Sequence, residues 1–342
     1  MKIKLLNLVI VCTIIGVSLG CTSTPASTSI STLMPTNVPP TFTSSAPVVT
    51  TLSPTLLPES VWSPMEMIWK TQGNPHTLGM PTELALDEQG NIYVIDGDNH
   101  RVQKFDKDGN FLLTWGSHGA GDGQFLFNVP HVFYGGSVTV DKDGYVYVTD
   151  HHNRIQKFDS NGTFLMKFGR TGYADGEFAT LGGIAVDDQG NIYTADWIQY
   201  EIQKFDNEGK FLQKWEVPSC KPGGISFPHK VVLDGQGHIY IPNADGHCVQ
   251  KFDTEGNLLQ QWGTFGEAAG QFQKPRSLAL DAQGNIYVSD NGNGRIQKFA
   301  PDGNFLAVYG PFDYPVGIEV DSESYVYVVE IVVGRLQKLR LE

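Results

Sequence analysis

The fold is decided by the stretch LALDEQGNIYVID at residues 84–96, which continues into RVQKF at residues 101–105. Five further copies of this pattern follow along the chain. An aspartate closes the first apolar run of each copy: Asp87, Asp141, Asp187, Asp234, Asp281 and Asp321. Spacings of about 40–50 residues are typical of repeat architectures, in which each unit buries its faces against its neighbours. Six copies therefore predict one closed object.

A single copy contains four short segments rich in β-branched and aromatic residues, at 84–86, 92–96, 101–105 and 111–115. An Asp-x-x-Gly sequence at 87–90 lies between the first and second segments, and another at 106–109 lies between the third and fourth. Both sequences suit turns, because the aspartate accepts backbone N–H bonds and glycine tolerates a positive φ. Four antiparallel strands per copy predict a propeller blade. The predicted fold is therefore all-β, a six-bladed β-propeller.

The ends of the chain predict how the ring closes. The sixth copy stops one strand short, at residues 336–342, whereas an unused apolar segment lies at residues 65–69. Its Trp69 precedes Trp115, the aromatic that ends the fourth strand of the first copy, by about one repeat length. We expect this N-terminal strand to complete the last blade, which leaves no blade edge unpaired.

The copies resemble the NHL repeat family. The resemblance lies in residues 91–96 followed by Asn99, His100, Arg101 and Val102, in residues 281–299, and in the spacers at 121–125 and 270–272. It covers about residues 65–342. It implies a six-bladed propeller and says little about activity, because propellers host many unrelated functions.

The first sixty residues predict export. Lys2 and Lys4 precede an apolar run at 5–19, which is shorter than the roughly 20 residues of a membrane span and suits a signal peptide at residues 1–20. The segment Ser18-Leu19-Gly20-Cys21 resembles a bacterial lipoprotein box, which implies lipidation of Cys21 and attachment to a cell membrane, facing the extracytoplasmic side. Ser18 departs from that box, and ordinary cleavage to a secreted protein is the alternative.

A stalk is predicted at residues 21–61, ahead of a propeller domain at 62–342. Of residues 22–60, 25 are Ser, Thr or Pro. Such a composition buries too little apolar surface to fold. We expect a membrane attachment through the lipid alone and a monomeric protein.

The charge balance argues against nucleic acid as a partner. The formal net charge is −13, and removal of residues 1–20 with two lysines makes it −15. Nucleic-acid binding needs a basic footprint, so the RNA binding known for some animal NHL domains is not expected here. Many of the acids lie in the repeat turns, which favours a solvated rim.

Two cysteines remain in the predicted propeller. Cys220 lies in the loop between the third and fourth blades, and Cys248 begins the third strand of the fourth. Both places share one face of a propeller, and the expected compartment is oxidising, so a disulfide is possible. The sequence leaves open whether the two cysteines form this bond or remain free thiols.

Residues present in every blade are poor candidates for a site, because equivalent positions around a ring do not converge on one ligand. The repeated Gln, Lys and Tyr are expected to pack and hydrogen-bond between strands. A ligand site is expected instead where the repeats differ, on the face that holds the loops between strands two and three and between blades. The predicted ligand-binding residues are His131, Tyr134, His151, His152, Trp197, Tyr200, His229, His247 and Arg276.

A metal-dependent enzyme is the alternative. The peptide-amidating lyases resemble this fold and place zinc-binding histidines after a proline, a pattern that only Pro228-His229 meets here. Propeller lactonases use carboxylates in the channel, where Glu83 and Glu319 lie on first strands. We predict binding or sensing of a protein, peptide, glycan or small molecule without a cofactor and without catalysis. A structural Ca²⁺ or Zn²⁺ stays open.

Overall fold

The computed structural model describes residues 63, 65–70, 77–128, 135–224 and 226–341. The chain divides into two units, Met1–Ser45 and Ala46–Glu342, and all described residues lie in the second. The predicted signal peptide, the whole predicted stalk with Cys21, His131 and Tyr134 lie outside the described residues.

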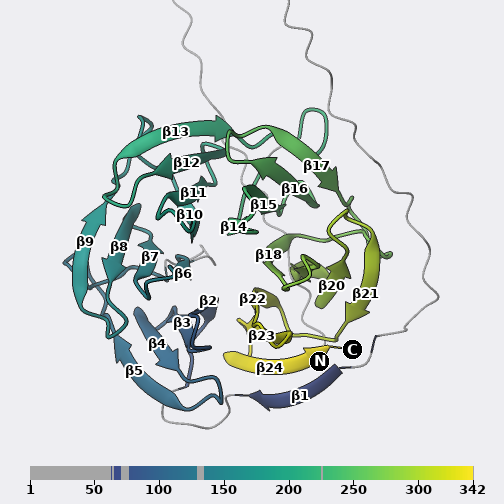
Figure 1. Ribbon diagram of the computed structural model, residues 1–342, viewed down its shortest axis with the longest axis horizontal. Coiled ribbons are helices and arrows are strands. Elements are labelled where there is room, and N and C mark those ends of the chain that lie inside the picture. Colours follow the sequence, from purple (N-terminus) through teal and green to yellow (C-terminus); the bar gives the residue numbers. More distant parts are fainter. Residues whose placement is uncertain (1–62, 64, 71–76, 129–134, 225, 342) are drawn as a thin grey trace, which may run out of the picture. The chain divides into compact units, whose positions relative to one another are not determined.

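Six four-stranded antiparallel sheets form a ring, as predicted (Figure 1). Within each sheet the strands follow chain order from the inside of the ring to the outside. The first three blades are β2 (Pro81–Leu86), β3 (Ile92–Asp96), β4 (Arg101–Phe105) and β5 (Phe111–Trp115); β6 (Val138–Val140), β7 (Val146–Asp150), β8 (Arg154–Phe158) and β9 (Phe164–Phe168); and β10 (Leu181–Val186), β11 (Ile192–Asp196), β12 (Glu201–Phe205) and β13 (Phe211–Glu216).

The other three blades follow the same order, and the sixth takes its outer strand from the start of the propeller. They are β14 (Val232–Leu233), β15 (His238–Asn243), β16 (Cys248–Asp253) and β17 (Leu258–Trp262); β18 (Pro275–Leu280), β19 (Ile286–Asp290), β20 (Arg295–Phe299) and β21 (Phe305–Tyr309); and β22 (Pro315–Val320), β23 (Tyr325–Glu330), β24 (Arg335–Leu341) and β1 (Met65–Lys70).

The predicted closure is confirmed. Strand β1 pairs antiparallel with β24, with Met65 opposite Leu341 and Lys70 opposite Gln337. The Trp69 ring lies against the turn of the first blade, where its Nε1 donates to Lys107 O at 3.2 Å. A Cβ at Gly109 would lie 3.0 Å from that ring, so the close contact requires glycine. Trp115, Phe168, Trp215 and Trp262 pack in the same way on a turn glycine of the following blade.

Hydrophobic side chains fill the seams between the blades. The repeated first and second strands supply most of this core, including Leu84, Val94, Ile184 and Val288. The fourth strands alternate between half-buried and exposed residues, as in the Phe211–Glu216 strand. This alternation follows from their place at the outside of the ring, where one sheet face meets water.

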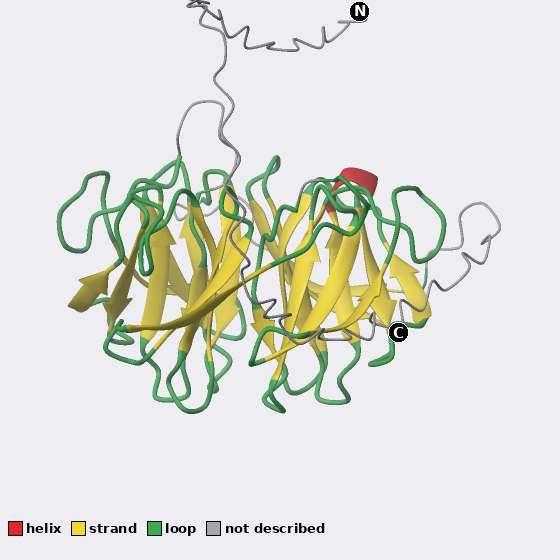
Figure 2. Ribbon diagram, turned by 90° about the horizontal axis from the view of Figure 1, so that it is seen from above, coloured by secondary structure: helices red, strands yellow, loops and turns green. Residues whose placement is uncertain are grey.

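The two faces of the ring differ in their loops. We call face A the side with the connections between strands two and three and between successive blades, and face B the side with the other two turns. Figure 2 shows longer loops on the side that carries the short helix η1 (Asn291–Asn293), which is face A. Face B has the short Asp-x-x-Gly turns, in which each aspartate accepts the backbone N–H two residues on, as for Gln89.

The inner strand of the fourth blade, β14, is only 2 residues long. Pro228 forms only an isolated bridge to Asn243, and regular pairing starts at Val232. Other inner strands also shift register near their start, as between Pro275 and Leu278. Within the described part of the chain, no helix has the length and apolar character needed to cross a bilayer.

Candidate functional site

A buried acidic residue ends the second strand of five blades and holds the face A loops. In the fifth blade Asp290 accepts bonds from Arg295 Nε at 2.7 Å, from Gln297 Nε2 at 3.0 Å and from the backbone N–H of Gln273 at 2.7 Å. Arg295 also donates to the carbonyl of Glu267 in the preceding loop. The repeated Gln and Arg thus tie strand three to the loop before the blade, and the hydrogen-bonding role predicted for the Gln ring is confirmed.

A second network holds the face B turns. Asp281 Oδ2 accepts from Asn285 Nδ2 at 2.8 Å and from the Tyr287 hydroxyl at 3.2 Å, while Lys298 Nζ lies 3.7 Å away. The Lys298 ammonium also lies 4.8 Å from the centre of the Tyr287 ring. Burial, and then the charge of Asp281, raise the pKa of Tyr287. The repeated Tyr therefore has the structural role that the sequence predicts.

The centre of the ring is crossed by an ion-pair cluster. Lys230 lies 2.7 Å from Glu319 Oε1 and 3.3 Å from Glu83 Oε1, and it donates to Ile318 O at 3.3 Å. These residues come from blades four, six and one. Burial raises the pKa of Glu83 although Lys230 opposes the shift. Burial alone would lower the pKa of Lys230, but the two carboxylates outweigh it and raise it. The two predicted channel carboxylates are thus joined to an ammonium.

Three of the predicted site residues meet at the face A end of the channel. The rings of Trp197 and His229 lie 4.8 Å apart, and Arg276 Nη2 lies 2.9 Å from His229 Nε2. Burial, and then the charge of Arg276, lower the pKa of His229 well below its usual value. His229 is therefore neutral, and its Nε2 accepts the bond from Arg276.

This mouth is nearly closed. Its cavity has a volume of about 20 Å³, which is room for about one water molecule. Trp197 is only 5% exposed, because its ring lies over Gly182, where a Cβ would come within 2.0 Å of Trp197 Nε1. A ligand of drug size needs about 300–1,000 Å³.

The other predicted residues lie elsewhere on face A. His152 Nε2 donates to Gly119 O at 3.2 Å, and the backbone N–H of His151 donates to Leu126 O. His247 packs on Phe265 with ring centres 4.9 Å apart, and its Nδ1 accepts from the Lys274 N–H. Tyr200 lies in a tight turn with a φ of 56°. None of these contacts places the residues against the channel mouth.

Several exposed apolar side chains lie in the loops of face A, and of these the sequence reasoning singled out only Tyr200. We call them the apolar rim. Tyr173 is 73% and Phe265 56% exposed. The rim consists of Tyr173, Ile198, Tyr200, Phe265, Tyr314, Val332 and Val333. The signal that could have found them is their position in face A loops outside the repeat pattern.

Cys220 and Cys248 form a disulfide, with their Cα atoms 6.4 Å apart. The bond ties the loop before the fourth blade to the start of β16. For metal ions, the described residues contain no group of three or more His, Cys, Asp or Glu side chains arranged to hold one.

Comparison with known proteins supports the repeats and the fold. The NHL repeat model matches residues 78–105 and 272–299, and a model of the SMP-30/gluconolactonase/LRE-like region matches residues 145–232. Human NHL repeat-containing protein 3 is 40% identical over 95 residues, which is 27% of this chain and 25% of that protein. The Drosophila melanogaster protein brain tumor is 32% identical over 118 residues, 34% of this chain and 10% of that protein. The chain matches only about a quarter or less of these relatives' lengths.

Solved structures share the architecture at low identity. A streptogramin B lyase aligns with a TM-score of 0.56 and 14% identity over 81% of this chain and 97% of its own. A gluconolactonase from Xanthomonas campestris aligns with a TM-score of 0.60 and 16% identity, over 81% and 89%. A Bacteroides thetaiotaomicron protein of unknown function reaches 0.63 at 17% identity, over 81% and 76%. These likenesses show the fold alone.

Proposed function

We propose that this propeller is a binding module that docks a protein or peptide partner on face A. The apolar rim carries the proposal. Aromatic residues are enriched in protein interfaces relative to the rest of the surface. Tyr173, Phe265 and Tyr314 are all more than half exposed and stand on a rigid ring.

The closed mouth favours a partner that lies across the face over a small molecule that enters the channel. Trp197, His229 and Arg276 pack together and line a cavity of only about 20 Å³. Glu83 also lines this cavity, and Lys230 forms ion pairs with Glu83 and Glu319. His229 and the buried Arg276 then close the centre of the docking surface and leave the partner to contact the loops around it.

The second candidate is a hydrolase or lyase at the same mouth. The match of residues 145–232 to the SMP-30/gluconolactonase/LRE-like region favours it, since that segment contains Trp197 and His229. Glu83 and Glu319 are the carboxylates that such an enzyme would use. In this structure both contact Lys230, which leaves them less free to bind a substrate or an ion.

The test of docking compares rim and outer-strand variants. Partners would be captured from the source organism on the purified protein, identified, purified and titrated by calorimetry. Phe265→Ala with Tyr314→Ala is expected to weaken binding at least tenfold, because buried aromatic anchors carry most of an interface's energy. Leu165→Ala with Leu212→Ala is the matched control, since both leucines are 46% exposed but lie on outer strands.

Equal affinity of the rim variant and the wild type would overturn the docking proposal. For the enzyme candidate, gluconolactone and a streptogramin B antibiotic are the substrates to assay, with and without added divalent cations. Turnover that is lost in Glu83→Gln would favour the enzyme over the binding module.

We also propose that the propeller works outside the cytoplasm, on a lipid attached to Cys21. The disulfide between Cys220 and Cys248 supports an oxidising compartment. Metabolic labelling with a palmitate analogue is expected to mark the wild-type protein and not Cys21→Ala. Label on both proteins, or on neither, would contradict the anchor.

A further inference from the structure

The fourth blade departs from the network that holds the face B turns. In the other five blades the repeated tyrosine hydroxyl donates to the turn aspartate at 2.9–3.2 Å, from Tyr93, Tyr147, Tyr193, Tyr287 and Tyr327. In the fourth blade His238 Nδ1 lies 2.6 Å from Asp234 Oδ2. The Tyr240 side chain, although only 2% exposed, has no hydrogen bond to any residue that the structure describes.

The lysine of this blade also differs from the lysines of the first, fifth and sixth blades, whereas Lys157 and Lys204 of blades two and three lie over a tyrosine ring as it does. Lys104, Lys298 and Lys338 lie 3.3–3.9 Å from the turn aspartates of their own blades. Lys251 lies over the Tyr240 ring, with Nζ 5.0 Å from its centre. Within the described part of the chain it forms neither an ion pair nor a hydrogen bond. Two polar groups that are engaged in the first, fifth and sixth blades are therefore left available here.

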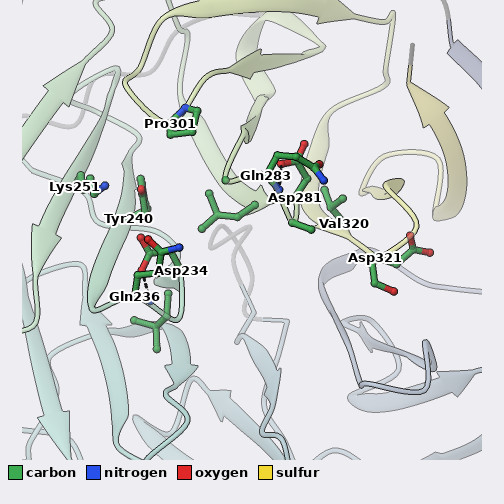
Figure 3. A pocket seen from close by; sticks show the side chains of 14 residues that line it. Asp234, Gln236, Tyr240, Lys251, Asp281, Gln283, Pro301, Val320 and Asp321 are labelled. Atoms are coloured by element: carbon green, nitrogen blue, oxygen red, sulfur yellow. Dashed lines mark hydrogen bonds between the residues drawn. The ribbon is translucent and has the colours of Figure 1, made fainter.

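Both groups line a cavity on face B. It has a volume of about 500 Å³ and lies between blades four, five and six. Figure 3 shows Tyr240 and Lys251 on one side, Asp234 and Gln236 below them, and Asp281 and Gln283 across the cavity. Leu233, Leu280 and Val320 add apolar surface from the ends of the inner strands. The volume falls within the range of ligand pockets, about 300–1,000 Å³.

The charges around the cavity select the chemistry of its ligand. Lys251 is the one basic residue among those that line the cavity, and it weakens the attraction of a cationic ligand to the carboxylates. The turn carboxylates of Asp234, Asp281 and Asp321, in a chain of net charge −13, repel a strongly anionic one. What remains is a neutral ligand with many hydroxyl groups, because the ammonium donates, the carboxylates accept, and the phenol and the amides of Gln236 and Gln283 do both.

We propose that this cavity, which we call the blade-four pocket, binds a neutral saccharide on face B. The Tyr240 hydroxyl and the Lys251 ammonium bond its hydroxyl groups, and the leucines contact the apolar face of a sugar ring. The site is separate from the apolar rim, because the rim residues lie in face A loops. A protein partner on face A and a sugar on face B can therefore bind independently.

The test uses calorimetric titration of the full chain with glucose, N-acetylglucosamine, cellobiose and chitobiose. Sodium phosphate and spermidine serve as the anionic and cationic comparators. At least one saccharide is expected to bind, and Tyr240→Phe and Lys251→Met are each expected to weaken it at least tenfold. Tyr240→Phe is expected to fold normally, since the hydroxyl that it removes has no bond within the described protein.

Two further variants separate the pocket from general effects on the fold. Tyr93→Phe is the matched control in the first blade, where the hydroxyl bonds Asp87; we expect a lower melting temperature and an unchanged affinity. His238→Asn restores the residue found at Asn91, Asn191 and Asn285 and is expected to weaken binding by returning Tyr240 to the aspartate.

Three results would overturn the proposal. The first is that no saccharide of the panel binds, and the second is that Tyr240→Phe and Lys251→Met bind as the wild type does. The third is binding of phosphate or spermidine in place of the sugars, which would assign the cavity to a charged ligand. Rim variants are expected to leave the saccharide affinity unchanged, so failure of this site and failure of docking on face A are distinguishable.

Discussion

Blades four and five are neighbours in the ring but hold their face A loops by different means. In blade five the buried carboxylate of Asp290 pairs with Arg295, whose Nη1 and Nη2 reach carbonyls of the preceding loop. Blade four has Asn243 and Cys248 at the same two positions, and Cys248 is bonded to Cys220 in its own preceding loop. A covalent bond thus does in one blade what a guanidinium does in the next.

In blade four both members of the pair have changed together, whereas blade three keeps Asp196 and has Glu201 at the arginine position. An arginine beside Asn243 would be a buried charge without a carboxylate, and a carboxylate beside Cys248 would lack its cation. On face B of the same blade, a single exchange changes the hydrogen bonds of the turn. His238 takes the turn aspartate, and two side chains of the network then face a pocket.

The largest effect is expected at Lys230, which blade four has where blade five has Ser277. Lys230→Met leaves Glu83 and Glu319 close together and without their ammonium. Removal of one partner of a buried ion pair lowers the free energy of unfolding by about 3–5 kcal/mol. Urea denaturation would measure it, with Lys251→Met as the control, and addition of Glu83→Gln should recover part of the loss. A loss below about 1 kcal/mol would show that the cluster does not stabilise the ring.

The disulfide is expected to come next. The bridge spans 28 residues, and a loop of that size stabilises by about 3–4 kcal/mol in the chain-entropy model. Cys220→Ser with Cys248→Ser should lower the free energy of unfolding by that amount. Reductant should affect the wild type and leave the double variant unchanged. Equal stability of the two proteins would mean that loop 217–231 is held by other contacts.

A smaller effect separates the two blades on face B. Tyr287→Phe removes a hydroxyl bonded to the carboxylate of Asp281, and hydrogen bonds to charged groups contribute about 1.5–3 kcal/mol. Tyr240→Phe removes a hydroxyl that has no such bond, so its free energy of unfolding is expected to stay within about 0.5 kcal/mol of the wild type. Equal losses in the two variants, measured by urea denaturation, would contradict the difference between the blades.

The repeats explain why the ring could be predicted and the closed mouth could not. Asp87 and its five equivalents recur with their turns, and Trp69 matches Trp115, so blade number and closure follow from local pattern. Positions 229 and 276 are equivalent starts of inner strands, which is why the structure brings His229 and Arg276 together as expected. Burial of Trp197 depends instead on Gly182 of a neighbouring strand, where the missing side chain makes room.

Contacts across the ring could not be predicted from the sequence either. Glu83 and Glu319 stood out in the sequence, but their partner Lys230 is 147 and 89 residues away from them. Only the closed ring brings blade four opposite blades one and six. The exchange at His238 could not be interpreted from the sequence either. Its consequence for Tyr240 needed the positions of both side chains around Asp234.

The smallest expected effect is a pH dependence at the junction of blades four and five. The pKa of His229 is lowered by burial and by the charge of Arg276, which blade five provides. In the unfolded chain the imidazole of His229 takes up a proton near its ordinary pKa of about 6.5, whereas in the folded protein it stays neutral until a lower pH. The unfolded state then binds more protons, so stability is lost as pH falls below about 6.5. We expect the melting temperature of the wild type to fall more steeply between about pH 6.5 and 4.5 than that of His229→Gln, with His118→Gln behaving as the wild type. Parallel curves for all three proteins would mean that His229 titrates in the folded ring as it does in water, and that Arg276 and the packing of Trp197 do not hold it neutral.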